Sequence, residues 1–119
     1  MHLFRVSHEE GGVWMNDSEF NRLADMALKQ IETGLDDCAA DIDVSTVATG
    51  VLEIEFENGS KIIVNRHGTA QEIWIAALSG GFHYRWDGNA WLDTRDQSEL
   101  MSALSALVSR QSGVPVSLV

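Results

Sequence analysis

Carboxylates crowd into the first half of this sequence, and their type and spacing suit the binding of metal cations. Residues 15–58 contain eleven acidic residues and two basic ones, whereas residues 59–119 contain five of each. Carboxylate oxygens are ligands for hard cations such as Mg²⁺, Ca²⁺, Mn²⁺ and ferric iron, and they tolerate ferrous iron. The candidate metal ligands are Asp25, Glu32, Asp36, Asp37, Asp41 and Asp43.

Three of these acids would share one face of a helix. At about 100° per residue, Asp25, Glu32 and Asp36 project within about 40° of one another. The arrangement is locally unfavourable, because Glu32 and Asp36 repel each other four residues apart. Asp36 and Asp37 also fall at the helix end where the macrodipole prefers cations. Acids kept against such local costs favour a functional site, and the alternative is a solvated charged face.

The sequence contains no motif that would enclose a cation or support catalysis. It has no calcium-binding loop, no His–Cys cluster, no nucleophile motif and no nucleotide-binding loop. We therefore expect weak binding on an open surface, and we do not expect an enzyme. The net charge of −10 disfavours nucleic acid and anionic membranes, which carry the same sign. It favours cations or a basic protein partner.

The element that must position most of these acids is a helix predicted over residues 17–37. Asn16 and Glu19 form a capping box at its start, with Met15 and Phe20 as a hydrophobic staple. Apolar residues recur along it at helical spacing. Six short strands separated by turn residues follow, over residues 42–47, 51–57, 61–65, 72–77, 82–86 and 90–93.

A second helix closes the pattern. Asp96 and Glu99 predict its capping box, and Gly113 marks its end. The apolar tail, residues 114–119, should pack back on the domain. Short connections make neighbouring strands antiparallel, and both amphipathic helices must bury an apolar stripe. The predicted fold is therefore an α+β two-layer sandwich, with an antiparallel sheet of about six strands and both helices on one face.

That arrangement leaves the other face of the sheet open. Strand alternation directs Trp74 to the open face, near Asn65 or Ile63 of the preceding strand, which makes it a candidate interface anchor. The alternative is that Trp74 packs under the chain termini. We interpret Tyr84 and Trp86 as core residues. The histidines His67 and His83 are interpreted as structural or solvated, with His83 a possible neighbour of the open face.

The chain is predicted to be one domain over residues 15–119, preceded by a non-core extension over residues 1–14. Its one cysteine, Cys38, excludes an intrachain disulfide and favours a reducing compartment, the cytoplasm. Cys38 itself is interpreted as a small buried side chain. No apolar run approaches the roughly 20 residues that span a bilayer.

Several segments resemble the bacterial frataxin (CyaY) family across residues 15 to about 113. They are residues 15–25, 35–37, 51–65, 71–74 and 80–83, with Trp91. The resemblance implies a helix–sheet–helix sandwich and a role as a regulator of iron–sulfur cluster assembly. It implies weak binding of Fe²⁺ or Fe³⁺ along an acidic ridge that comprises Glu32, Asp36, Asp37, Asp41 and Asp43.

The same resemblance implies protein partners, namely the cysteine desulfurase and the iron–sulfur scaffold protein. Trp74 and Asn65 match the contacts on the sheet face, and Asp36 and Asp37 match contacts on the ridge. Two other hypotheses stay open at this point. The protein would be an iron chaperone or store in the first, and in the second a protein-interaction module that needs no metal.

Overall fold

The computed structural model describes residues 14–119, so the extension predicted over residues 1–14 lies outside them except for Trp14, which is exposed. The first helix, α1, spans Asp17–Asp36. The side chain of Asn16 accepts a hydrogen bond from the backbone N–H of Glu19 at 2.8 Å. Met15 and Phe20 are both buried beside this cap. The predicted start of the helix is therefore confirmed, and its end differs by one residue.

Six antiparallel strands form one open sheet in the order β1-β2-β3-β4-β5-β6, so each strand pairs with its neighbours in the chain. All six predicted strands are present, and each of their ends lies within two residues of the predicted one. The strands are β1 (Ile42–Ala48), β2 (Val51–Phe56), β3 (Lys61–His67), β4 (Glu72–Ala77), β5 (Gly80–Trp86) and β6 (Trp91–Asp93).

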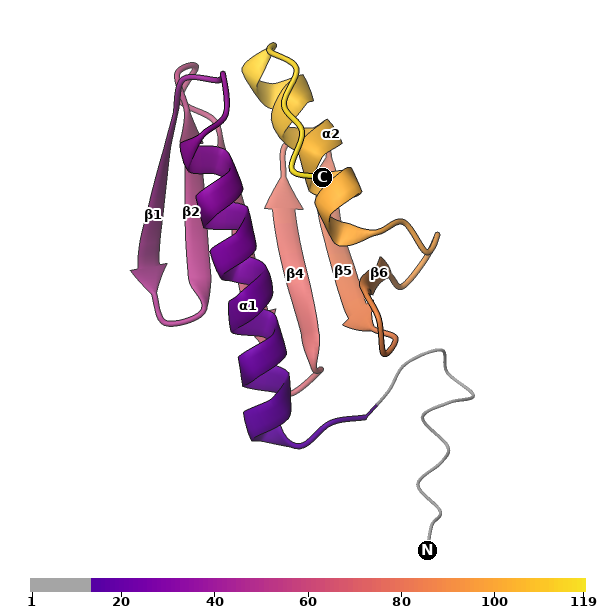
Figure 1. The fold of residues 1–119 in the computed structure, drawn as a ribbon. Coiled ribbons are helices and arrows are strands. Elements are labelled where there is room, and N and C mark those ends of the chain that lie inside the picture. Colours follow the sequence, from indigo (N-terminus) through magenta and orange to yellow (C-terminus); the bar gives the residue numbers. More distant parts are fainter. Residues whose placement is uncertain (1–13) are drawn as a thin grey trace, which may run out of the picture.

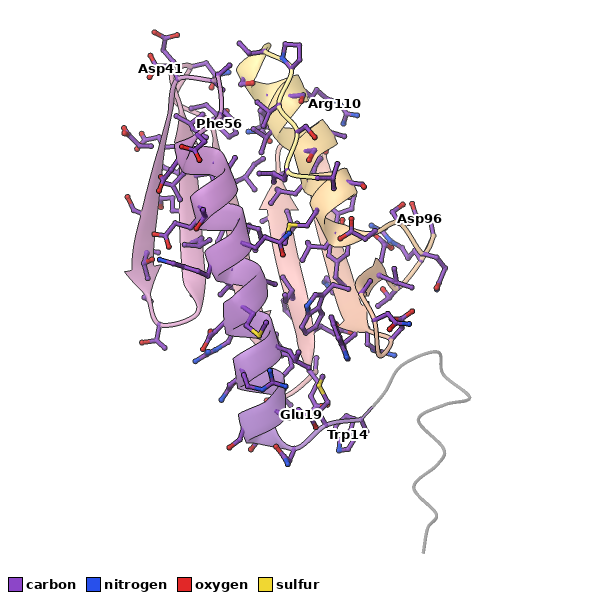
Figure 2. The ribbon with its side chains drawn as sticks, in the orientation of Figure 1. Trp14, Glu19, Asp41, Phe56, Asp96 and Arg110 are labelled. Carbon is purple, nitrogen blue, oxygen red and sulfur yellow. The ribbon has the colours of Figure 1, made fainter. Side chains whose placement is uncertain are left out.

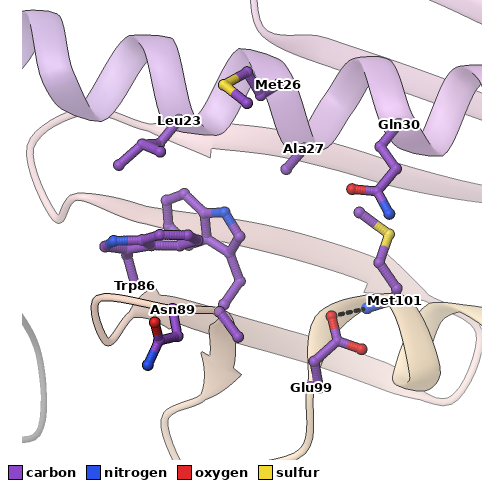
Figure 3. Close-up of a pocket in the computed structure, with 10 residues that line it drawn as sticks. Leu23, Met26, Ala27, Gln30, Trp86, Asn89, Glu99 and Met101 are labelled. Carbon is purple, nitrogen blue, oxygen red and sulfur yellow. Dashed lines mark hydrogen bonds between the residues drawn. The ribbon is translucent and has the colours of Figure 1, made fainter. Parts of the chain in front are cut away.

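The last helix, α2, spans Leu100–Ser112, and its start corrects the predicted capping box. Glu99, not Asp96, is the N-cap: its carboxylate accepts the N–H groups of Met101 at 2.8 Å and Ser102 at 3.0 Å (Figure 3). The reason is an isolated β-bridge between Leu92 and Glu99, which holds Glu99 itself in an extended conformation, so that the helix begins only after it. The carboxylate of Asp96 instead accepts the N–H of Ser98.

Both helices lie on the same face of the sheet, which gives the predicted two-layer sandwich (Figure 1). The core between the layers contains Phe20 and Ile31 from α1 and Ile54, Ile73 and others from the sheet. In the part of the chain that the structure describes, no helix has both the length and the apolar character needed to cross a bilayer.

The two aromatic residues predicted for the core differ in burial. Tyr84 is fully buried, and this burial, aided by the Asp93 carboxylate, raises the pKa of its phenol to about 12. Trp86 is only half-buried, because it lies at the end of β5 and lines a shallow groove with Leu23 and Met26 of α1 (Figure 3).

The C-terminal tail packs against the helical layer, as predicted. The N–H of Leu118 donates to the hydroxyl of Ser105 in α2 at 2.8 Å. The side chain of Leu118 reaches α1 at Gly34, where an added Cβ would lie 2.7 Å from its Cδ2 atom. The tail thus fills a notch that exists because residue 34 has no side chain.

Gln71 ties the start of the domain to the sheet. Its side-chain amide accepts the N–H of Met15 at 3.0 Å and donates to the Met15 carbonyl, and the side chain is buried. We expect Gln71→Ala to lower the free energy of unfolding by about 1–3 kcal/mol, because it leaves buried backbone groups unpaired. Chemical denaturation measures this loss.

Gln97→Ala is the matched control for that variant. Both glutamines have a positive φ, 55° at Gln71 and 66° at Gln97, so alanine meets the same backbone strain at each position. The Gln97 side chain is exposed. An equal loss of stability in both variants would contradict a role for the Gln71 amide.

Candidate functional site

Two exposed acids lie where α1 ends. Asp36 and Asp37 are exposed, and the last turn of α1 contains no basic residue. Asp37 is the C-cap, and its N–H donates to the carbonyl of Leu35. The negative end of the helix dipole therefore adds to two carboxylates. This end of the molecule should attract cations and basic protein surfaces.

A second acidic group lies on the neighbouring strands. Asp43 pairs with Glu55 across β1 and β2. The next pair is Ile42 with Phe56, and Asp41 and Glu57 lie one residue beyond it. The side chains of Asp41, Asp43, Glu55 and Glu57 line one shallow hollow at the end of the sheet, where Asp41 is labelled in Figure 2. The sequence analysis missed Glu55 and Glu57 as site candidates. Alternation in β2, combined with the Asn58-Gly59 hairpin turn that follows it, was the signal that could have found Glu55.

Two predicted ligands already have cationic partners. Asp25 forms an ion pair with Arg66 of β3, whose side chain occupies the space left open by Gly50. Glu32 lies 3.6 Å from the ammonium group of Lys29. A metal ion would have to compete with these partners, so both acids are weaker candidates than Asp36 and Asp37. They remain predicted ligands.

The carboxylates do not form a preformed metal cage. Within residues 14–119, no three Asp, Glu, His or Cys side chains converge as ligands of one ion. A cation on this surface would be held by exposed side chains that must rotate toward it, and side-chain ordering of this kind weakens binding. The arrangement suits a cation that binds and leaves readily.

Trp74 lies on the open face of the sheet, as predicted. It pairs with Asn65 of β3, while its neighbours Ile73 and Ile75 are buried in the core. Its indole is stacked between two imidazoles, with ring centroids 3.8 Å from His67 and 4.4 Å from His83. The predicted anchor is therefore the centre of a three-ring stack.

The buried carboxylate of Glu72 holds the indole of Trp74 in place. Glu72 accepts the indole N–H of Trp74 at 2.8 Å and a hydrogen bond from Arg85 at 2.6 Å. Its side chain is only 7% exposed. The sequence analysis did not assign Glu72, His67 or His83 to a site. Alternation alone would have placed Glu72 on the face of Trp74, but the stacking depends on the register of three strands.

The fold and these surfaces define a class of small α+β protein with an open acidic edge and an open sheet face, and the described residues contain no group of three or more potential metal ligands. The chain belongs to the frataxin-like family, because the family model of the frataxin-like domain matches residues 14–114.

Relatives with high sequence identity carry one name. The chain is 58% identical over 104 residues to the iron–sulfur cluster assembly protein CyaY of Dechloromonas aromatica, covering 87% of this chain and 99% of that one. It is 53% identical over 108 residues to the CyaY protein of Janthinobacterium sp., covering 87% of this chain and 96% of that one.

Solved structures agree with the fold. A frataxin of the CyaY family from Psychromonas ingrahamii superposes with a TM-score of 0.82 at 37% identity, covering 88% of this chain and 99% of that one. A trimeric frataxin from the yeast Saccharomyces cerevisiae, complexed with ferrous iron, has a TM-score of 0.57 at 22% identity, covering 85% and 91%. The yeast protein supports the fold alone.

Proposed function

We propose that this protein acts in iron–sulfur cluster assembly, as a regulator that holds iron weakly and docks to the cysteine desulfurase and the scaffold protein. The observation that carries the proposal is the family membership together with an acidic end of α1 whose last turn contains no basic residue. The protein would work in the cytoplasm and would catalyse no reaction itself.

Iron, ferrous or ferric, is the cargo or effector in this proposal rather than a resident cofactor. Its ligands are drawn from Glu32, Asp36, Asp37, Asp41 and Asp43, with Asp25 at the margin. Exposed carboxylates suit hard cations, so other divalent ions should compete for the same surface. The open arrangement supports weak binding, which allows iron to be passed on.

The proposed docking uses two surfaces. Asp36 and Asp37 at the end of α1 would meet a basic surface of the desulfurase. Trp74 and Asn65 on the open sheet face would meet the scaffold protein. An indole held by a buried carboxylate is preorganised, which lowers the entropy lost on docking.

Iron titration by NMR tests the metal half of the proposal. In the unmodified protein, ferrous iron should perturb the amide signals around residues 32–43. In Asp36→Asn with Asp37→Asn, these perturbations should require at least about tenfold more iron, because two exposed ligands without a cationic partner in the last turn of α1 lose their charge.

Asp17→Asn with Glu19→Gln provides the matched control. It removes the same charge from the opposite end of the same helix, so it should leave the titration unchanged. If the variants titrate alike, the iron site does not involve the end of α1.

Two alternative functions predict different experimental results. An iron chaperone or store, which the open surface also suits, should lose iron transfer to an acceptor protein when Asp36 and Asp37 are changed. A metal-independent interaction module, which the prebuilt Trp74 stack suits, should dock equally well with iron and with a chelator. A pull-down from native extract, with and without added iron, separates these cases.

A further inference from the structure

One long edge of the sheet is open. Within residues 14–119, β1 is the first strand of the sheet and pairs with β2 on one side, and Figure 1 shows no described helix or strand on its other side. At the opposite edge, β6 has only three residues, and the bridge between Leu92 and Glu99 occupies part of it. β1 has seven residues and contains neither proline nor lysine, two residue types that discourage pairing at an edge.

The turn after β2 shows which backbone groups of β1 point outward. Phe56, at the end of β2, exchanges hydrogen bonds with the turn that leads to β3, so its backbone groups face β3. Because this direction alternates along a strand, the groups of Glu55 face β1, where its partner is Asp43. Ser45, two residues further on, faces β2 in the same way. The residues of β1 whose N–H and carbonyl groups point away from the sheet are therefore Ile42, Val44 and Thr46.

The two faces of this edge differ in chemistry. The side chains of Ile42 and Val44 are half-buried and pack against the core on the helical side. Asp43 and Glu55 lie opposite each other on the open face, and both are exposed. A strand added beside β1 would therefore meet apolar side chains on the helical side and carboxylates on the open face.

The charges around this edge favour a basic partner. Residues 25–67, which comprise much of α1 and the first three strands, contain nine acids and three bases. Each base forms an ion pair with one of these acids, namely Lys29 with Glu32, Lys61 with Glu53, and Arg66 with Asp25. Within residues 14–119, the acids of this range that have no ion pair are Asp36, Asp37, Asp41, Asp43, Glu55 and Glu57.

The other arginines of residues 14–119 lie away from β1. Arg22 is earlier in α1, where it contacts the sulfur of Met26. Arg85 is in β5 and Arg95 follows β6, at the far side of the sheet. Arg110 is in α2, and α1 lies between α2 and β1 (Figure 1). A second copy of this chain would bring a net charge of −10 to this acidic edge, whereas a basic segment would be attracted to it.

We propose that the outer edge of β1, from Ile42 to Thr46, binds an extended segment of a partner protein as an added strand, and that this segment alternates apolar and basic residues. Backbone hydrogen bonds supply affinity in such strand addition, and alternate side chains supply specificity. The apolar side chains would extend the core beside Val44, and the basic ones would meet Asp43 and Glu55. The inference goes beyond the proposed function, because it concerns neither the end of α1 nor the Trp74 face.

Amide hydrogen exchange measured by NMR tests the edge. In the protein alone, the N–H groups of Asp43 and Ser45 should exchange more slowly than those of Ile42, Val44 and Thr46, because only the former bond to β2. A short capped peptide of alternating lysine and valine serves as the probe. At saturation it should slow exchange at the three outward amides by at least about tenfold. Unchanged exchange with bound peptide would mean attraction by charge alone and would overturn the proposal.

Thr46→Pro separates strand addition from charge. Proline removes one outward N–H and its ring blocks an approaching strand, but every charge and the bonds to β2 remain. The variant should bind the labelled peptide at least about tenfold more weakly in fluorescence anisotropy, because one backbone bond and the fit of its neighbours are lost. Thr46→Val, which keeps the N–H, is the matched control and should bind like the unmodified protein.

A peptide methylated at its backbone nitrogens gives a second comparison that needs no variant to fold. It keeps the lysine charges but cannot donate backbone hydrogen bonds, so the unmodified protein should bind it much more weakly. Equal binding of both peptides would contradict strand addition. Protection of the outward amides that grows with protein concentration, without peptide, would assign the edge to a second copy and overturn the proposed partner.

These outcomes are independent of the proposed function. If the peptide protects the outward amides but no desulfurase or scaffold protein is captured from extract, the proposed function fails and the edge of β1 stands as a docking site. If the machinery is captured but the peptide leaves these amides unprotected, the inference about β1 fails and the proposed function stands.

Discussion

Charge reversal by Asp36→Lys with Asp37→Lys is expected to abolish capture of the cysteine desulfurase at low salt. The change removes two negative charges and adds two positive ones at an end of α1 that contains no basic residue in its last turn. Because like charges across an interface cost several kcal/mol, we expect affinity to fall by at least about a hundredfold. A pull-down at low salt measures the loss.

Misfolding cannot explain this result, because the same variant should be slightly more stable. Lysine at a helix C-terminus is favoured by the dipole by about 0.3–1 kcal/mol per residue. The opposite reversal, Asp17→Lys with Glu19→Lys in the first turn, should lower stability while leaving docking intact. Retained docking in the first variant would refute the ridge as a contact for the desulfurase.

Trp74→Ala is expected to weaken docking of the scaffold protein by about 2–4 kcal/mol, which is roughly 30- to 1,000-fold, because buried tryptophans dominate interface energies. Isothermal titration against the purified scaffold protein measures this change. The substitution also removes the ring between His67 and His83, so the stability of the variant must be measured alongside.

Trp86→Ala is the matched control for Trp74→Ala. Trp86 is also half-buried, but it lies on the helical side of the sheet, where it lines the groove beside Leu23 (Figure 3). Its loss should reduce stability without affecting docking. Equal losses of affinity in both variants would mean that docking depends on general stability rather than on the Trp74 face.

Local chemistry made most of the fold predictable. The Asn16 cap, the Asn58-Gly59 turn with its positive φ of 88° at Gly59, and the Gly113 cap in the left-handed region each act within a few residues. A sequence pattern displays such interactions directly. The alternation of strands likewise placed Trp74 on the correct face.

Interactions between distant segments were not predictable in this way. The capping box assigned to Asp96 is wrong because a β-bridge with Leu92 holds Glu99 in an extended conformation, and the helix begins after it. The ion pair between Asp25 and Arg66 joins residues 41 positions apart. No periodicity within either segment could indicate it.

The candidate site was therefore predictable in composition but not in geometry. The acids at the end of α1 could be identified from the sequence because they repel one another and the negative end of the helix dipole. The contribution of Glu55 depends on its pairing with Asp43 across β1 and β2. The stack around Trp74 depends on β3 reaching His67, two residues beyond the predicted end of that strand.

The contact between Leu118 and Gly34 affects how samples of this protein should be compared. The helix that carries Glu32 and Asp36 packs against the last residues of the chain, so loss of those residues by proteolysis would remove a contact that supports it. Preparations with ragged ends would then differ in melting temperature although every ridge carboxylate is intact. Mass spectrometry of the intact chain should therefore precede any comparison of ridge variants.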